Sequence, residues 1–467
     1  MKSIINYLWM IGVLLLQSCY SSKLLVKPTS SQVAWADAEI GVLIHFDINI
    51  FPTKPDIGFN PNVPDLKVFN PQKLNTDQWL ETASLLGAKY AILTVNAGTG
   101  FSLWPTNVHE YHVGNTPWRE GQGDIIADFI QSCRKYGIKP GLYYNTNCNM
   151  YYGVEDGGMT LTGEKRDEFQ SAVLKQLEEI WANYGSLFEI WFDGGVLVDE
   201  KGGISSSVSK LIDTYQPDAI MMGGPLNQKN LIRCAVKENG IVDYPNWSTT
   251  DIITTSGDTG YYARYNGVER IITGKGSPDG NRWCPTEALS PNRRTHKSNG
   301  AWNGGWLWLP NEEEYIKPAD ELVGFYYRSV GGNANLLLGM GIDTNGLFPE
   351  ADKLQFELAG KEISRRFDKV IAETSGKGKI VRLKVDKRPR VINHVVLQEN
   401  IVNGEHIRKY IVEAKIDGKW TFLCDGEFVG HKRIHQFDPV ITRDIRLRVT
   451  EAKRIPMIKR LSVYYVD

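Results

Sequence analysis

The sequence predicts an α/β protein: a (β/α)8-like barrel of the TIM type, followed by a smaller C-terminal β-sandwich. From Trp35 onward, short apolar segments alternate with amphipathic helical segments, and four successive strand–helix–strand units imply parallel strands. After residue 372 the pattern changes to alternating apolar and polar residues separated by turns, which is typical of antiparallel strands. A chain of 467 residues also exceeds what one hydrophobic core normally fills, so two domains are expected.

The predicted barrel covers residues 35–372, and its elements follow from hydrophobic periodicity and from helix start and stop signals. Asp124 is suited to cap one helix and Gly137 to end it. A doubly wound open sheet is the alternative, but no GxGxxG motif opens the first helix. The expected strands are 40–46, 90–95, 139–144, 187–193 and 219–222, and the expected helices are 76–87, 124–137, 167–184 and 206–215.

The predicted sandwich covers residues 373–467. The tract 373–379 has no core-forming residue, so it is expected to be a linker. Packing support for the barrel is the preferred role of the sandwich, and carbohydrate binding is the alternative. Its expected half-buried strands are 381–385, 395–397, 410–416 and 445–449.

Composition narrows the class of protein. A net charge of −1 gives no general electrostatic attraction for nucleic acid or anionic lipid, so no nucleic-acid partner is expected. The chain has 13 tryptophans and 21 tyrosines, which suits a carbohydrate-binding enzyme, although large cores also use aromatic residues. Apart from Cys19, five cysteines remain and none forms a CxxC pair, so neither a disulfide framework nor a thiolate metal site is expected. We expect no metal and no cofactor.

The first residues have the pattern of a targeting segment. Lys2 precedes an apolar run from Ile4 to Leu16 that is too short for a comfortable membrane span. The following Leu16-Gln17-Ser18-Cys19 resembles the lipobox of bacterial lipoproteins, in which the cysteine is lipidated after cleavage. We therefore expect a signal peptide at 1–18, a lipid anchor on Cys19 and a tether at 19–34, with a plain cleaved signal peptide as the alternative. The resulting lipoprotein would be exported to the periplasmic or outer-membrane face, and its anchor would be its only membrane contact.

Asp193 is the first candidate for chemistry. It ends the apolar run 187–192 and precedes Gly194 and Gly195. An aspartate before glycine often only opens a turn. In a barrel, however, the C-terminal ends of all strands meet on one face, where Asp193 would join His45, the loop 96–99 and Asn145.

Glycoside hydrolysis by double displacement requires a carboxylate nucleophile and a second carboxyl group about 5–5.5 Å away that acts as acid and then as base. Two glutamates compete for the second role. Glu238 follows a basic and apolar segment, and Glu287 follows Trp283-Cys284-Pro285-Thr286. Spacing alone does not choose between them.

Seven short motifs run in order over about 300 residues: Gly41–Phe46, Gly87–Thr94, Gly100–Thr106, Asn115–Trp118, Glu189–Gly194, Asn246–Thr249 and Ser329–Leu338. Together they resemble the glycoside hydrolase family 29 α-L-fucosidases, particularly the bacterial and plant-like subgroup. The resemblance implies a retaining exo-glycosidase that removes terminal α-L-fucose from a glycan, on a barrel with a C-terminal sandwich.

The resemblance also implies roles for individual residues. Asp193 matches the family nucleophile, and motif order favours Glu238 over Glu287 as acid/base, although Val236-Lys237 stands where Gly-Asn is expected. The substrate-binding residues it implies are His45 as a sugar hydrogen-bonding residue, Trp191 and Trp247 as apolar walls, and Trp104, Asn96 and the pocket residue Glu287.

One loop departs from the family pattern. The family carries two histidines that hold sugar hydroxyls before a Gly-Phe pair, whereas this chain has Asn96-Ala97-Gly98-Thr99. Loss of such donors can change specificity by orders of magnitude. Two alternatives therefore accompany the fucosidase hypothesis: a glycosidase for a galactose-configured sugar, and an inactive glycan-binding lipoprotein.

Overall fold

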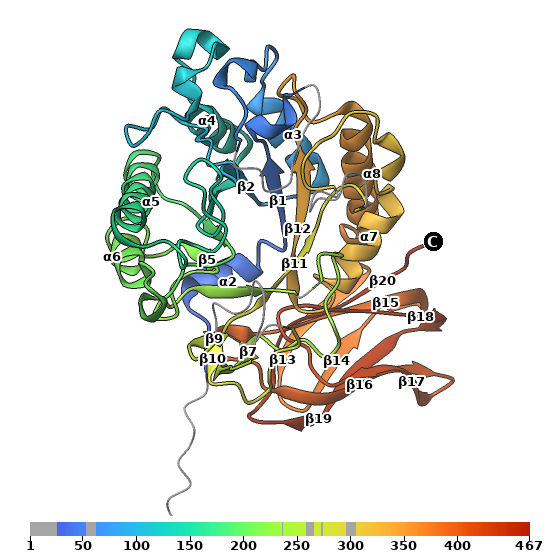
Figure 1. The fold of residues 1–467 in the computed structure, drawn as a ribbon. Coiled ribbons are helices and arrows are strands. Elements are labelled where there is room, and N and C mark those ends of the chain that lie inside the picture. The colour runs from blue at the N-terminus through green and yellow to red at the C-terminus, as the bar shows by residue number, and fades with distance from the viewer. Residues whose placement is uncertain (1–25, 53–61, 236, 258–265, 272–273, 296–304) are drawn as a thin grey trace, which may run out of the picture.

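Eight parallel strands form a closed barrel in the computed structural model, which describes residues 26–52, 62–235, 237–257, 266–271, 274–295 and 305–467 (Figure 1). This closure confirms the predicted barrel and excludes the doubly wound open sheet. The predicted signal peptide and Cys19 lie outside the described residues. In order around the barrel the strands are β1 (Ile40–His45), β2 (Tyr90–Asn96), β3 (Lys139–Asn145), β4 (Glu189–Asp193), β5 (Ile220–Met222), β6 (Leu231–Cys234), β11 (Thr286–Ser290) and β12 (Ala334–Gly341).

The helices surround this barrel, and their ends follow the expected capping chemistry. The Asp124 side chain accepts a hydrogen bond from the Ala127 amide at the start of α4, and Gly137 ends that helix with a φ of 66°. None of the described helices combines the length and apolar character needed to cross a membrane. The barrel helices are α3 (Thr76–Leu86), α4 (Ile125–Tyr136), α5 (Gly163–Asn183), α6 (Ser205–Tyr215), α7 (Ala319–Arg328) and α8 (Glu350–Phe367).

A further helix, α2 (Ser30–Ala36), closes the N-terminal end of the barrel. The Gln32 amide donates to the carbonyl of Leu231, the first residue of β6, and the Trp35 indole donates to Glu189, the first residue of β4. The tether expected at 19–34 is therefore too long, because its last five residues belong to this helix. Sequence periodicity could not show this, since a helix of seven residues spans only about two turns.

The C-terminal part forms two four-stranded antiparallel sheets, as predicted for a sandwich. The expected linker 373–379 is wrong: most of it lies in edge strand β13, which pairs with β20. Backbone hydrogen bonds to one neighbour hold an edge strand, so β13 forms without large apolar side chains. One sheet contains β13 (Ala372–Lys377), β20 (Met457–Tyr464), β15 (Arg390–Glu399) and β18 (Arg433–Thr442), and the other contains β14 (Ile380–Lys384), β19 (Asp444–Ala452), β16 (Ile407–Ile416) and β17 (Lys419–Gly426).

The sandwich packs on the barrel through buried polar and aromatic contacts. The buried Glu405 carboxylate accepts hydrogen bonds from the Ser248 hydroxyl at 2.6 Å and from the Asn333 amide at 2.7 Å. Asn333 directly precedes β12, so this contact lies near the N-terminal ends of the strands. The interface is thus at the opposite end of the barrel from the strand ends that carry Asp193, which suits a packing role for the sandwich.

Candidate active site

Asp193 is the last residue of β4, and two side chains of the neighbouring strand β3 hold its carboxylate. The Tyr143 hydroxyl donates to Asp193 Oδ2 at 2.6 Å, and the Asn145 amide donates to the same oxygen at 3.3 Å. Parallel pairing sets this geometry, because Asn145 lies beside Asp193 and Tyr143 lies beside Trp191 in the register. Burial and the Asp193 charge hold the pKa of Tyr143 well above its ordinary value, so its hydroxyl remains a donor.

Glu238 follows β6 and is exposed. Its Oε2 accepts a hydrogen bond from the Trp306 indole at 2.8 Å. The Trp306 ring lies 5.1 Å from the ring of His45, and the His45 ring lies 6.0 Å from that of Tyr143. The ring of His45 therefore lies between that of Trp306, which binds Glu238, and that of Tyr143, which binds Asp193.

Cys234 is the last residue of β6, four positions before Glu238 in the chain. Burial raises the pKa of its thiol to about 11, and the charges of Glu287, Glu238 and Asp193 contribute in the same direction. The charges of Asp193, which ends β4, and of Glu238, which follows β6, thus both act on this one thiol. Both carboxylates that the sequence proposed for catalysis lie where a barrel strand ends, Asp193 at the end of β4 and Glu238 after β6.

His45 ends β1, with the rings of Tyr143 and Trp306 as neighbours. Burial lowers the pKa of its imidazole to about 4, so the ring is neutral near pH 7. Its Nδ1 lies 3.5 Å from the Leu43 carbonyl, to which it can donate a hydrogen bond, and this leaves Nε2 as an acceptor. A neutral acceptor at the end of β1 fits the predicted hydrogen bond with a sugar hydroxyl.

Trp191 and Glu287 lie deeper in the barrel. The Trp191 ring stacks on Tyr143, with centroids 5.4 Å apart and planes at 14°. The Trp191 indole donates to Glu287 Oε2 at 3.2 Å, and the Tyr90 hydroxyl donates to Oε1 at 2.7 Å. Glu287 is 0% exposed, so the structure places it inside the barrel and not at the strand ends with Asp193.

Three other predicted binding residues lie away from Asp193. Trp104 is buried, and its indole donates to Glu179 of α5 at 3.0 Å. Trp247 packs at the sandwich, where the Arg408 guanidinium lies 4.5 Å from its ring. Asn96 is fully buried and donates to the Gly100 carbonyl at 3.2 Å, so its amide holds the loop. These contacts tie the three side chains to α5, to the sandwich and to the loop after β2.

The loop that departs from the family pattern is covered by the segment after β3. The Met150 amide donates to the Gly98 carbonyl at 2.9 Å. A Cβ atom placed on Gly98 would lie 3.9 Å from Cys148 Cβ and 4.0 Å from Met150 Cε. The Thr99 hydroxyl donates to the buried Asp47 carboxyl at 2.7 Å. A Cβ atom at Gly98 would therefore be in ordinary van der Waals contact with the segment after β3.

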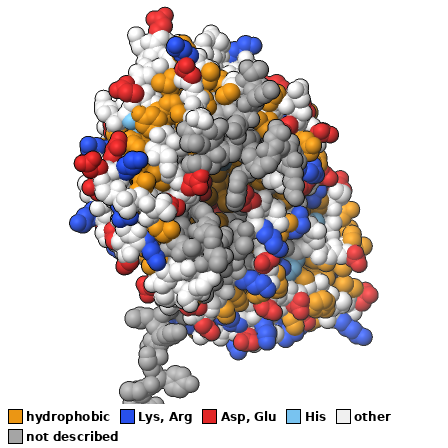
Figure 2. All heavy atoms as spheres, viewed as in Figure 1, with side chains coloured by type: hydrophobic (Ala, Val, Ile, Leu, Met, Phe, Trp, Pro, Cys, Tyr) orange, Lys and Arg blue, Asp and Glu red, His pale blue; other side chains and the backbone are white. Residues whose placement is uncertain are grey.

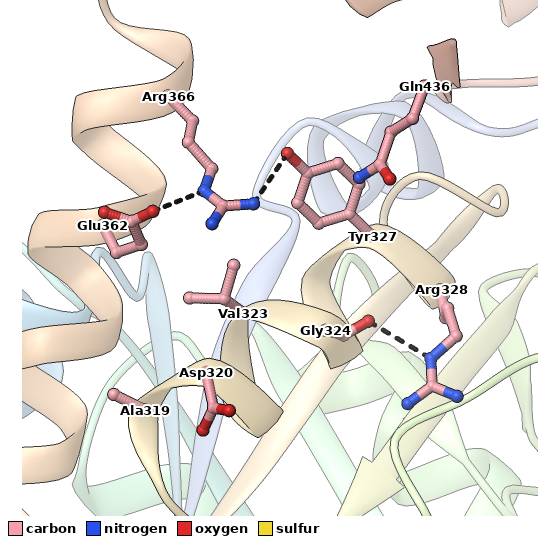
Figure 3. A pocket seen from close by; sticks show the side chains of 9 residues that line it. All are labelled: Ala319, Asp320, Val323, Gly324, Tyr327, Arg328, Glu362, Arg366 and Gln436. Atoms are coloured by element: carbon pink, nitrogen blue, oxygen red, sulfur yellow. Dashed lines mark hydrogen bonds and ion pairs between the residues drawn. The ribbon is translucent and has the colours of Figure 1, made fainter. Parts of the chain in front are cut away.

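The surface shows a hollow in the middle of the view in Figure 2, with acidic side chains beside it. A separate groove of about 490 Å³ lies between α7, α8 and β18 (Figure 3). There Arg366 binds Glu362 and the Tyr327 hydroxyl, so its charge is already paired. This groove contains neither Asp193 nor Glu238. Among the residues that the structure describes, no three His, Cys, Asp or Glu side chains are grouped to hold a metal ion.

Four residues that interact with the predicted site residues were not identified from the sequence. Tyr143 had a usable signal, because it lies two positions before Asn145 on a strand and so faces the same side. Glu189 also had a usable signal, because it alternates with Trp191 and Asp193 along the strand and so faces the same side. Cys234 is a lone cysteine, and Trp306 follows a stretch without clear periodicity, so no pattern identified either.

Known proteins resemble this chain over both of its parts. Residues 54–363 match the family model described as Alpha-L-fucosidase. A candidate α-L-fucosidase from Bacteroides thetaiotaomicron is 36% identical with a TM-score of 0.84, covering 95% of this chain and 100% of that one. A glycoside hydrolase 29 family member from an unknown rumen bacterium is 27% identical with a TM-score of 0.76, covering 96% of this chain and 78% of that one. Alpha-L-fucosidase 1 of Arabidopsis thaliana is 26% identical, covering 94% of this chain and 87% of the plant protein.

Proposed function

Because the chain belongs to the α-L-fucosidase family, glycoside hydrolase family 29, we propose that it is a retaining exo-glycosidase that hydrolyses terminal α-L-fucosides of glycans. The observation that carries this proposal is the pair of carboxylates at the C-terminal ends of β4 and β6, each with its own hydrogen-bond donors. Asp193 is held by Tyr143 and Asn145, and Glu238 is held by Trp306. The family match favours the fucosidase over the galactoside-specific and non-catalytic alternatives.

The proposed reaction has two steps. An Asp193 oxygen attacks the anomeric carbon while Glu238 donates its proton to the departing glycosidic oxygen, which yields a fucosyl ester and the released alcohol. Glu238, now ionised, then takes a proton from water as that water attacks the same carbon. Free fucose leaves with retained configuration, Asp193 is again a carboxylate and Glu238 is again protonated.

The remaining residues position the sugar. Neutral His45 offers an acceptor to a hydroxyl group, and the half-buried rings of Trp191 and Trp306 offer apolar faces for the sugar C–H groups and its methyl group. The hydroxyl of Tyr143 keeps the attacking carboxylate in one orientation. Near-attack positioning of this kind is a large part of enzymatic rate enhancement.

The test uses purified protein and a panel of nitrophenyl glycosides. We expect clear preference for the α-L-fucoside, and loss of almost all turnover in Asp193→Ala and in Glu238→Ala. Added azide should restore turnover in at least one of these variants, because a small anion can replace a missing carboxylate. Preference for a galactoside, or full activity in Asp193→Ala, would contradict the proposal.

We also propose that the protein is an exported lipoprotein, anchored through Cys19 at the periplasmic or outer-membrane face. The support is the sequence alone: Lys2, the apolar run 4–16 and the lipobox-like 16–19. Expression of the full chain in a bacterial host with a labelled fatty acid should give a labelled, membrane-associated protein. Cys19→Ala should remove the label, and an unlabelled wild-type protein would contradict the anchor.

A further inference from the structure

The barrel interior holds two carboxyl groups that the proposed reaction does not use. Glu189 begins β4 and Glu287 is the second residue of β11, and both side chains are 0% exposed. Glu189, Trp191 and Asp193 alternate along β4, so all three project into the barrel, with Asp193 nearest the strand end. The two glutamates therefore lie beneath the nucleophile.

The hydrogen bonds to the two carboxyls are unequal. Each oxygen of Glu287 has a donor, the Tyr90 hydroxyl on Oε1 and the Trp191 indole on Oε2. Glu189 has only the Trp35 indole, at 2.8 Å from Oε2, and its buried Oε1 has no donor among the described residues. The carboxyls of Glu189 and Glu287 interact directly with each other. A proton on Glu189 Oε1, donated to Glu287, would complete this network.

Electrostatics require such a proton. Burial raises the pKa of both carboxyls, and the charge of Glu287 raises that of Glu189 further. No described lysine or arginine contributes to either shift, so two ionised carboxylates side by side would be costly. The other titratable groups facing the pair are Tyr90 and Cys234, and burial raises the pKa of each, so both are neutral.

We propose that Glu189 and Glu287 act as one proton-sharing pair, in which protonated Glu189 donates to the Glu287 carboxylate, and Glu287 in turn fixes Trp191. Trp191 stacks on Tyr143, and Tyr143 donates to the nucleophile Asp193. The pair therefore contains two positioning residues that act on Asp193 through two aromatic side chains. The inference rests on the proposed function, because it gives the nucleophile its support.

The network predicts different outcomes for two chemically equal substitutions. In Glu189→Gln the amide N–H₂ still donates to Glu287, so the network stays complete. In Glu287→Gln the amide presents N–H₂ on one side, where it faces the donor of Trp191 or of Tyr90. The Tyr90 hydroxyl can rotate to accept, but an indole N–H can only donate. Glu287→Gln therefore releases Trp191 or leaves two buried donors opposed.

The first measurement is kcat and KM on an aryl α-L-fucoside, with circular dichroism to check folding. We expect Glu287→Gln to lower kcat by about 100-fold and Glu189→Gln by less than about threefold, since small misplacements of reacting groups cost about that much. Trp191→Phe removes the donor of the hydrogen bond between Trp191 and Glu287, so its loss of kcat should resemble that of Glu287→Gln. The double variant with both substitutions should lose no more kcat than either single variant. Equal losses in the two glutamine variants would overturn the proposal.

The second measurement requires no substrate. A buried carboxyl with a raised pKa binds more protons in the folded state, so its contribution to stability is lost as pH rises above the unfolded value of about 4.5. The melting temperature of the wild type should therefore decrease as the pH rises from 5 to 8. In Glu189→Gln, which lacks one of the two carboxyls, the melting temperature should decrease less steeply with pH. An unchanged slope in Glu189→Gln would contradict the shared proton. A wild type without fucosidase activity would instead refute the proposed function, and this slope would still test the pair.

If Glu287→Gln fails to fold, Trp191→Phe and the Glu189→Gln slope decide the question. A folded Trp191→Phe with wild-type kcat would contradict the positioning role.

Discussion

The hydroxyl of Tyr143 offers a sharp test of how the nucleophile is held. Tyr143→Phe removes one oxygen atom, the donor that lies 2.6 Å from Asp193 Oδ2, and leaves the ring that stacks on Trp191. A hydrogen bond to a charged group contributes about 1.5–3 kcal/mol. If all of it serves to orient Asp193 for attack, kcat should fall by about 10- to 150-fold, since about 1.4 kcal/mol is a factor of ten. KM should change little, because the hydroxyl binds the carboxylate.

The neighbouring residue supplies a matched control. Tyr144 lies on the same strand but faces outward, where its hydroxyl donates to Gln176 of α5 at 2.7 Å. Tyr144→Phe makes the same chemical change in a buried site and should lower stability by about 1–3 kcal/mol, because the buried Gln176 Oε1 loses its donor. Its kcat should stay near the wild-type value. Steady-state kinetics on an aryl α-L-fucoside and urea unfolding separate the two effects. Tyr143→Phe with kcat within twofold of wild type would refute the reasoning, as would an equal loss in Tyr144→Phe.

Three further predictions concern other parts of the molecule. Trp306→Phe removes the hydrogen-bond donor to Glu238. For natural glycosides with poor leaving groups, kcat/KM should fall by about 10-fold, the cost of one lost hydrogen bond. For activated aryl fucosides it should fall little, because their leaving groups need less acid assistance. The Cys234 thiol, with its pKa raised to about 11, should resist iodoacetamide near pH 7 and react faster only as the pH approaches 11, as mass spectrometry of the labelled peptide would show. Rapid labelling at pH 7 would contradict the raised pKa. Asp352→Ala leaves the buried Arg293 without its carboxylate partner at 2.7 Å, so urea unfolding should show a loss of about 3–5 kcal/mol, and a loss below about 1 kcal/mol would contradict this account.

Much of the barrel was predictable because local signals and tertiary structure agree there. Asp124 and Gly137 delimit α4 as capping rules require, and strands such as β2 are long, apolar and bounded by such helices. The elements missed were short or depended on partners distant in sequence. Helix α2 is held by Leu231 and Glu189, and β13 exists through its pairing with β20, so neither is visible in a local window.

The candidate site likewise contains residues that the sequence identified and residues that only the fold reveals. Asp193 was found because strand ends in a barrel share one face, and the end of β4 is marked by Gly194. Depth within the barrel is not visible in a motif: Glu287 was expected in the sugar pocket, and it lies at the second position of β11, below the strand end. Trp306 shows a further limit, because only the fold brings it to Glu238.

The most direct test of the account is to identify the residue that bonds to the sugar. A 2-deoxy-2-fluoro-α-L-fucosyl donor with a good leaving group should form a long-lived ester, because the fluorine slows the second step of a retaining mechanism more than the activated first step. Proteolysis and mass spectrometry of the wild type should place the fluorofucosyl group on Asp193, and Asp193→Ala should remain unlabelled. A label on any other residue, or inverted configuration in the first fucose released from an ordinary substrate, would contradict Asp193 as the nucleophile.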